Sequence, residues 1–308
     1  MSNLNQLITE FLEYLQVERN VSPLTIRNYK HYLGRFSAWL GSNSSTPPRV
    51  SAINSDTVRK FRVFLARYED KNALTLKKIT QNYHLIALRA LLKYLNKKDI
   101  KTLSPDKIDL AKAESRSLKF LSREQLQRLL NQPDTTKAQG LRDRAILELL
   151  FSTGLRVSEL MRLNRDQIDF KSREIGVIGK GVRPRVVFVS DSSAHWLNQY
   201  LSFREDPYKP LFVRYSGKKA SVKQGEEGVR LSVRSIQRIV EKYVRKAKLP
   251  VKITPHGIRH TFATDLLTAG ADLRAIQEML GHKNISTTQI YTHVTNPQLK
   301  QIHQKFHK

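Results

Sequence analysis

The sequence lacks several features that would place it in common functional classes. None of its 308 residues is cysteine, which excludes disulfide bonds and thiolate metal sites. No apolar run approaches the ~20 residues that a membrane span requires. The stretch "MSNLNQLITEFLEYL" at residues 1–15 has no basic region of the kind that opens a signal peptide. We therefore expect a cytoplasmic protein with no membrane partner.

Two kinds of catalytic motif are also missing. The sequence contains no G-x-x-x-x-G-K-[ST] phosphate-binding loop, and it has no compact carboxylate cluster of the kind found in two-metal nucleases and polymerases. If this protein breaks a phosphodiester bond, we expect it to do so without a metal ion. We expect no other cofactor.

Acidic residues are scarce relative to basic ones. Lys and Arg number 54 against 27 Asp and Glu, which gives a formal net charge of +27. The excess lies in both halves of the chain, since residues 1–100 hold 16 basic and 7 acidic side chains and leave 38 and 20 for the rest. Positive charge along the whole chain favours a polyanionic partner, so it predicts nucleic-acid binding.

The first hundred residues have the periodicity of helices. Apolar residues of the first segment recur at helical spacing: Leu4, Leu7, Ile8, Phe11, Leu12 and Leu15. The Ser-Pro pair at 22–23 marks a second helix start, and further helices are predicted from residue 55 and over 75–96. We predict a helical domain of residues 1–110, followed by an exposed polar linker of 111–121.

Residues 122–308 are predicted to form a second domain. Ser122 and Gln125 make a capping box for its first helix. Alternating stretches at 174–180 and 184–190 flank a Gly-Lys-Gly turn and predict a β-hairpin. Helices are expected over or near these residues: 140–154, 193–204, 232–248, 255–269 and 273–280. The expected fold class is therefore mainly α with a small antiparallel β-sheet.

Several cations of the second domain are suited to binding a phosphate. Arg156 follows a Thr-Gly break, and Lys180 lies at the tip of the hairpin. His256 and Arg259 are three residues apart in the first turn of a helix, where backbone N–H groups favour an anion. Arginine forks can hold the nonbridging oxygens of a phosphate, and these contacts strengthen as charge grows in the transition state.

Phosphoryl transfer without a metal still needs a nucleophile, and Tyr291 is the candidate. A phenol is about one part in a thousand ionised at pH 7, so a base or a cationic pocket must supply about 4 kcal/mol. The nearby arginines could provide the field, and His256 could accept the proton. Ser286 and Gln289 form a capping box that would place Tyr291 in the second turn of a short helix.

Taken together and in chain order, these motifs resemble those of a known family. The sequence shows "TGLRVSEL", "GKGVRPRVVFV", "HGIRHTFATDLLTAGADLRAIQEMLGH" and "ISTTQIYTHV". The chain resembles the tyrosine recombinases of the phage-integrase family, most closely the Xer-type branch. The stretch "FLEYLQVERNVSPLTIRNYKHYLGRF" at residues 11–36 is similar to the family's core-binding domain. The resemblance implies a helical, SAM-like core-binding domain and an α+β catalytic domain.

The resemblance implies a site-specific recombinase that cleaves and rejoins DNA strands. Tyr291 would attack the scissile phosphate and form a 3′-phosphotyrosyl link. Arg156 and Arg259 would hold the nonbridging oxygens, and His282 would add a hydrogen bond. Because the bond energy stays in the phosphotyrosine, a 5′-hydroxyl of another strand can reverse the attack without metal or ATP.

Three further residues receive roles from the same resemblance. Lys180 would be the general acid for the leaving 5′-oxygen, and His256 would serve as a general acid/base. Glu159, three residues after Arg156, would orient the site without touching the phosphate.

The resemblance also implies an assembly. The family works as a tetramer on two DNA duplexes, and each protomer passes its C-terminal helix to a neighbour. An apolar stripe suits such a helix: Leu299, Ile302 and Phe306. The alternative is that this helix packs on its own domain. The sequence does not specify the DNA target. It also does not distinguish chromosome dimer resolution from integration or inversion, or say whether a paralogous recombinase or a DNA motor is a partner.

Three other functions fit parts of the sequence. A metal-dependent hydrolase could use His256 and His260, at i and i+4, with His282 or His293 as a third ligand. A DNA-binding regulator with a silent site fits the charge, and a type IB topoisomerase uses the same chemistry. EDTA-resistant covalent attachment to DNA would argue against the first, and salt-sensitive binding without adducts would favour the second. Rejoining without exchange between two sites would support the third.

Overall fold

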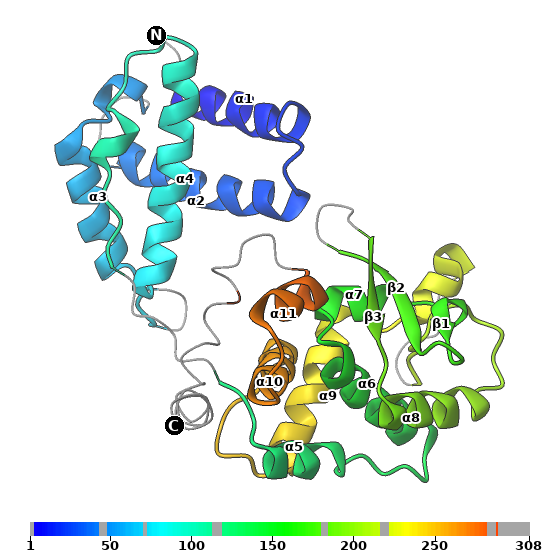
Figure 1. Cartoon of the computed structure of the whole chain (residues 1–308). Coiled ribbons are helices and arrows are strands. Elements are labelled where there is room, and N and C mark those ends of the chain that lie inside the picture. Colours follow the sequence, from blue (N-terminus) through cyan, green and yellow to red (C-terminus); the bar gives the residue numbers. More distant parts are fainter. Residues whose placement is uncertain are drawn as a thin grey trace, which may run out of the picture. The chain divides into compact units, whose positions relative to one another are not determined.

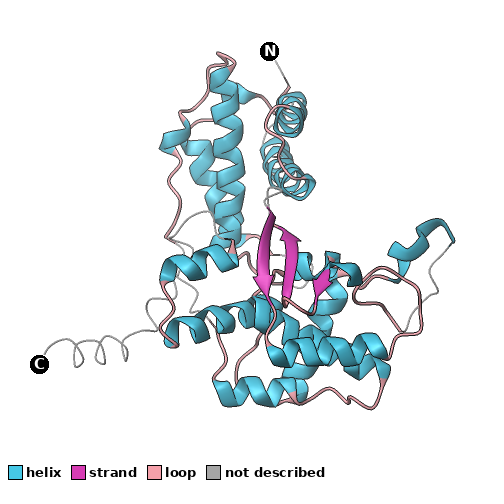
Figure 2. Ribbon diagram, turned by 45° about the vertical axis from the view of Figure 1, so that its right-hand side comes forward, coloured by secondary structure: helices cyan, strands magenta, loops and turns pink. Residues whose placement is uncertain are grey.

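The computed structural model describes residues 3–42, 48–69, 73–112, 119–179, 184–215, 222–281 and 288, and the chain divides into two compact units (Figure 1). The N-terminal unit is Met1–Arg116 and the C-terminal unit is Ser117–Lys308. Among the described residues, helices dominate both units, and a three-stranded antiparallel sheet lies in the C-terminal unit (Figure 2). The predicted fold class is confirmed.

The described part of the N-terminal unit is built from α1 (Leu4–Val17), α2 (Pro23–Ser42), α3 (Ser55–Arg67) and α4 (Lys78–Lys97). Short 3-10 turns lie at Val50–Ala52 and Pro105–Lys107. Helix α3 begins where predicted, because the Asn54 side chain accepts the Thr57 N–H at 2.9 Å and so satisfies a donor of the first turn.

The apolar faces of these helices meet in one core. Most of the stripe predicted for the first helix is buried: Leu4, Leu7, Ile8, Phe11 and Leu12. Helix α4 contributes Leu88, Leu91, Leu92 and Leu95. Each such side chain contributes about 1.5–3 kcal/mol by leaving water. Basic residues such as Arg27 and Lys60 stay exposed.

The C-terminal unit contains α5 (Arg123–Leu130), α6 (Ala138–Thr153), α7 (Val157–Arg162), α8 (Asp191–Ser202), α9 (Val233–Lys246), α10 (Pro255–Thr268) and α11 (Leu273–Leu280). Its strands, in sheet order, are β1 (Ile168–Asp169), β2 (Glu174–Ile178) and β3 (Pro184–Phe188). Short 3-10 segments lie at Arg165–Gln167 and Val222–Val229. In the register of β2 and β3, Ile175 is opposite Val187 and Val177 is opposite Arg185.

Most predicted starts in this unit are confirmed, but one helix begins earlier than expected and one strand was not predicted. The Ser122 hydroxyl accepts the Gln125 N–H at 3.3 Å, and the Gln125 side chain accepts the Ser122 N–H at 3.1 Å, so the capping box forms. The helix expected from residue 193 begins two residues earlier, because Ser190 is its cap and accepts the Ser193 N–H. Strand β1 was not predicted, since two residues are too short to show alternation.

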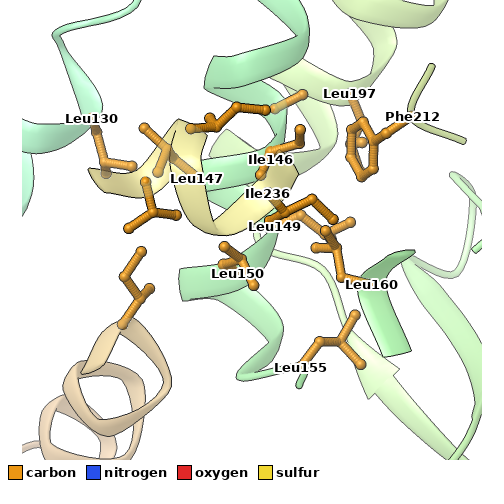
Figure 3. Close-up of a cluster of buried hydrophobic side chains, with 14 of the residues drawn as sticks. Leu130, Ile146, Leu147, Leu149, Leu150, Leu155, Leu160, Leu197, Phe212 and Ile236 are labelled. Carbon is orange, nitrogen blue, oxygen red and sulfur yellow. The ribbon is translucent and has the colours of Figure 1, made fainter. Parts of the chain in front are cut away.

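Helix α6 runs through the middle of the C-terminal core. Its apolar residues pack against side chains from α5, α7, α8 and α9 (Figure 3). The buried set includes Leu130, Ile146, Leu147, Leu149, Leu150, Leu155, Leu160, Leu197, Phe212 and Ile236. Helix α6 is buried around most of its circumference, so its neighbours enclose it and hold the residue that follows it in a well-defined position.

A buried polar network braces the first turn of α6. Arg142, 3% exposed, donates to the Asp143 carboxylate at 2.6 Å and to the Val213 carbonyl at 2.9 Å. The Tyr243 hydroxyl donates to the other oxygen of Asp143 at 2.9 Å. These groups satisfy one another inside the fold, which buried polar groups require.

No helix in the described part of the chain is long and apolar enough to cross a membrane.

Candidate active site

Helix α6 ends in a turn that only glycine accommodates. Gly154 has a left-handed backbone with φ 59°, and its N–H donates to the Leu150 carbonyl at 3.2 Å. A Cβ at this position would lie 2.4 Å from Cδ1 of Phe262 on α10. Glycine is therefore needed for its φ and for its small size. The turn places Arg156 at the start of α7.

Replacing Gly154 by alanine is expected to destabilise the C-terminal unit by about 2–5 kcal/mol, from backbone strain plus overpacking against Phe262. Gly270→Ala is the matched control, because Gly270 also has a positive φ, 95°, but no atom lies within 4 Å of its added Cβ. The control should lose only the strain contribution. Urea unfolding followed by circular dichroism measures both variants, and equal losses would contradict the packing argument.

Arg156 is held from two sides. Its backbone N–H donates to Oε2 of Glu159 at 2.9 Å, and its Nη1 donates to Oε1 of the same carboxylate at 2.9 Å. Its Nη2 donates to the carbonyl of Gly281 at 3.3 Å. The side chain remains 31% exposed. A guanidinium fixed in this way still presents donors to solvent, because it has five N–H groups.

Arg185 on β3 is a site residue that sequence reasoning missed. Its Nη1 and Nη2 donate to the two oxygens of Glu159 at 3.1 and 2.8 Å, and its Nε donates to the Met279 carbonyl at 3.2 Å. The sequence did contain a signal. Arg185 is two residues before the buried Val187, and alternate residues of a strand share a face, so the arginine was due to point inward.

Glu159 joins these two arginines. Its side chain is 5% exposed. Burial acts to raise the pKa of this carboxyl, but hydrogen bonds from Arg185 and from the Arg156 N–H outweigh burial and lower the pKa to about 2. Because the folded-state pKa lies below the ordinary value of 4.5, the resulting stabilisation is present above about pH 4.5 and is lost as the pH falls toward 2.

Arg259 lies almost entirely inside the fold, at 1% exposure. Helix α10 begins at Pro255, with Thr254 as cap accepting the Gly257 N–H at 3.3 Å. From this helix, Nη1 of Arg259 donates to the Gly154 carbonyl and Nη2 donates to the Leu280 carbonyl, both at 2.6 Å. The guanidinium therefore ties the end of α6 to the end of α11.

Two histidines accompany these arginines on α10. The rings of His256 and His260 meet edge to face, with centroids 4.2 Å apart and planes at 71°. Partial desolvation lowers the pKa of His256, and the charges of Arg259 and Arg156 lower it further. Burial, then His256 and Arg259, lower the pKa of His260 to about 4. Both imidazoles are therefore neutral near pH 7.

The end of α11 is where the three arginines converge. The carbonyls of residues 279–281 each accept a hydrogen bond from one arginine: the first from Arg185, the second from Arg259 and the third from Arg156. The last carbonyls of a helix have no partner within it, so these contacts satisfy groups that are otherwise orphaned. Gly281 closes the helix with φ 62°, as predicted for a glycine cap.

The structure thus brings together four of the seven site residues predicted from the sequence: Arg156, Glu159, His256 and Arg259. The other three, Lys180, His282 and Tyr291, lie outside the described residues. So do the predicted cap at Ser286, the apolar stripe of 299–306 and His293. In the part of the chain that the structure describes, no group of three His, Asp or Glu side chains could hold a metal ion.

Both units match known sequence families. Residues 119–297 match the "Phage integrase family", and residues 8–99 match the "Phage integrase, N-terminal SAM-like domain". The tyrosine recombinase XerC of Pelotomaculum thermopropionicum is 38% identical over 97% of each chain. The tyrosine recombinase XerD of Lacticaseibacillus casei is 36% identical over 99% of each chain.

Solved structures of recombinases and integrases are also similar to this chain. The XerA recombinase is 28% identical, covers 99% of each chain and has a TM-score of 0.52. The integrase of transposon Tn1549, at 18% identity and a TM-score of 0.74 over 98% of this chain and 99% of that one, shares the fold. With full-length relatives above 30% identity, the resemblance read from the motifs is confirmed: the chain belongs to the phage integrase family and is a site-specific tyrosine recombinase of the Xer type.

Proposed function

We propose that this recombinase cleaves and rejoins DNA through a covalent link between Tyr291 and a 3′-phosphate. The observation that carries the proposal is the meeting of Arg156 and Arg259 at the end of α11, from which the chain continues to Tyr291, with His256 close enough for both arginines to lower its pKa. Relatives support DNA as the partner. The XerH recombinase was solved on its difH substrate after cleavage, and a lambda integrase dimer was solved on a core site.

The two arginines are proposed to hold the nonbridging oxygens of the scissile phosphate. The Arg156 guanidinium is already oriented by Glu159 and by the Gly281 carbonyl and remains 31% exposed, so it needs little reorganisation when the phosphate arrives. As the phosphate becomes pentacoordinate its oxygens gain negative charge, and contacts that strengthen at that point lower the barrier. Arg156 is the more exposed of the pair, and Arg259 is the more rigidly held.

His256 is proposed to take the proton from Tyr291. Its pKa is lowered by desolvation and by Arg259 and Arg156, so the ring is neutral at physiological pH and can act as a base. By the family pattern, Lys180 would protonate the leaving 5′-oxygen and His282 would add a hydrogen bond to the phosphate. Glu159 would keep Arg156 in place, a role that its two hydrogen bonds to that residue support.

Neither metal nor ATP is required by this chemistry. The phosphodiester energy is conserved in the phosphotyrosyl bond, so attack by a 5′-hydroxyl from a second strand completes the exchange. The arginines supply the positive charge that a metal ion would otherwise place on the phosphate oxygens.

We also propose how the chain is divided and assembled. Residues 1–110 would form a core-binding domain, 111–121 a linker, and 122–308 the catalytic domain with its exchange helix. The break between units after Arg116 supports the division, and the basic excess in both halves supports DNA contact by each. The active assembly would be a tetramer on two duplexes with exchanged C-terminal helices, with or without a paralogous recombinase or DNA motor.

The unmodified protein is expected to form a covalent complex with DNA in the presence of excess EDTA and without ATP. The probe is a library of nicked duplexes with randomised arms, in which loss of a short strand traps the protein on its 3′-phosphate. A denaturing gel detects the complex, and sequencing of the trapped duplexes identifies the preferred site. The yield should match that obtained with Mg²⁺.

Other outcomes would favour other functions. Cleavage that disappears with EDTA and returns with Zn²⁺ or Mg²⁺ would contradict the proposal and favour a metal-dependent hydrolase. Salt-sensitive binding with no covalent complex on any duplex would favour a silent regulator. A covalent complex that only rejoins its own duplex, and never exchanges strands with a second one, would favour a topoisomerase.

A further inference from the structure

Arg185 differs from the other two arginines at the end of α11. Its side chain is 12% exposed, against 31% for Arg156. Each of its three nitrogens donates to a protein acceptor: Nε to the Met279 carbonyl, and Nη1 and Nη2 to the two oxygens of Glu159. A guanidinium bound on all three nitrogens is engaged within the protein and is suited to holding other groups in position.

The groups that Arg185 holds lead directly to the proposed phosphate site. Glu159 on α7 receives the fork of Arg185 on one side and both donors of Arg156 on the other. The Met279 carbonyl, which also binds Arg185, is two residues before Gly281, whose carbonyl binds Arg156. Arg185 therefore connects β3, α7 and α11 at one point.

We propose that Arg185 is a positioning residue for DNA strand cleavage, which sets the guanidinium of Arg156 against the scissile phosphate by holding Glu159 and the end of α11. The inference rests on the proposed function, since it takes Arg156 as a phosphate ligand. Arg185 itself makes no contact with DNA in this role.

The geometry explains why arginine is needed. Only a planar fork can bind both oxygens of one carboxylate and still present a third N–H to a carbonyl on another helix. A lysine could neutralise Glu159 but could not bind Met279 at the same time. The fit is tight, because a Cβ on Gly281 would lie 3.2 Å from the Cδ and Nη1 atoms of Arg185.

Removal of Arg185 should change how Glu159 responds to pH. Among the described residues, the charged groups that face its carboxylate are Arg156, from the turn before α7, and Arg185, from β3, while α11 contributes carbonyls to the same arginines. Burial already acts to raise the pKa of Glu159. Once Arg185 is gone, one partner remains, so the carboxyl should protonate at a higher pH and release Arg156.

The test measures single-turnover formation of the covalent complex between pH 5 and 9, with the trapped duplex of the preceding section as probe. The readout is the rate of Arg185→Met divided by the rate of the parent, which removes the pH dependence that the two proteins share. We expect a ratio of about 0.1 at pH 8 that falls by up to about tenfold per pH unit below the raised pKa of Glu159. Arg185→Lys should recover part of the rate and lessen the fall.

Two variants separate positioning from a general structural effect. The double variant Arg185→Met, Glu159→Gln should be slow with a ratio that no longer depends on pH, because no carboxyl is left to titrate. Arg162→Met is the charge-matched control, since Arg162 is exposed on the same helix α7. Its ratio should not vary with pH. Thermal unfolding of every variant ensures that rates are compared on folded protein.

The dependence of these rate ratios on pH decides whether Arg185 positions Arg156 through Glu159. A ratio for Arg185→Met that is near one, or that is low but the same at every pH, would overturn the positioning role. A pH-dependent ratio that persists in the double variant would overturn the part played by Glu159. If the parent itself forms no covalent complex, the proposed function fails instead, and that result is recognised before any variant is compared.

Discussion

A Tyr291→Phe protein is expected to form no covalent complex with DNA while it still binds the duplex. Phenylalanine keeps the ring but removes the oxygen that would attack the phosphate. Removal of a nucleophile leaves only background reaction, so the rate of complex formation should fall by at least about 10⁴-fold. The arginines and the basic surface are unchanged, so affinity measured by gel shift at one fixed salt concentration should stay within about twofold of the parent.

Tyr208→Phe is the matched control for this experiment. Tyr208 is a tyrosine of the C-terminal unit whose side chain is 37% exposed, and it has no part in the proposed chemistry. Its removal should leave the yield of covalent complex unchanged. If Tyr291→Phe protein still became attached to DNA, another side chain would be the nucleophile, and peptide mapping of the complex would identify it.

Arg259→Lys is expected to have the second largest effect. A lysine ammonium is a single point donor and cannot replace a fork that binds the Gly154 and Leu280 carbonyls at once. Loss of one positioned donor to a developing oxyanion costs about 10²- to 10³-fold in rate. Single-turnover cleavage at saturating protein measures this loss, and a gel shift should record a much smaller change in DNA affinity.

The same substitution should also destabilise the fold. Each buried carbonyl left without a donor costs about 1–3 kcal/mol. Arg142→Lys is the control, because Arg142 is a buried arginine that bonds the Val213 carbonyl and Asp143 on another part of α6. Both variants should lose stability in urea, but only Arg259→Lys should lose cleavage rate when assayed below its unfolding transition. Equal rate losses would show that stability alone explains the defect.

Local signals predicted the elements of this fold well. Helix starts depend on hydrogen bonds between residues two or three apart, so they can be recognised from short stretches. The caps at Ser122 and Thr254 and the helix start at Ser55 were predicted in this way. Gly281 was predicted as a cap for the same reason. The start at residue 191 was misjudged by two positions because three serines lie there, at 190, 192 and 193, and the structure uses Ser190 as the cap.

The site was predictable where chemistry and spacing coincide, as for the pair His256 and Arg259. It was not predictable where a contact joins distant parts of the chain. Arg185 and Glu159 are 26 residues apart and meet only because β3 packs against α11 and against α6, the helix that leads into α7. The spacing of residues along the chain does not reveal a contact of this kind. The alternation of β3 did indicate that the Arg185 side chain points inward, but not which residue it contacts. Lys180, His282 and Tyr291 stay predictions.

The hydrogen bonds at the end of α11 make the proposed phosphate site depend on the complete fold of the C-terminal unit. The last carbonyls of this helix accept hydrogen bonds from three other parts of the fold, namely β3, α10 and the turn before α7, so the phosphate site needs all of them in place. A nascent or locally opened chain would therefore lack an organised phosphate site. We therefore expect partly folded or locally opened protein not to cleave DNA, even where helix α11 itself has formed.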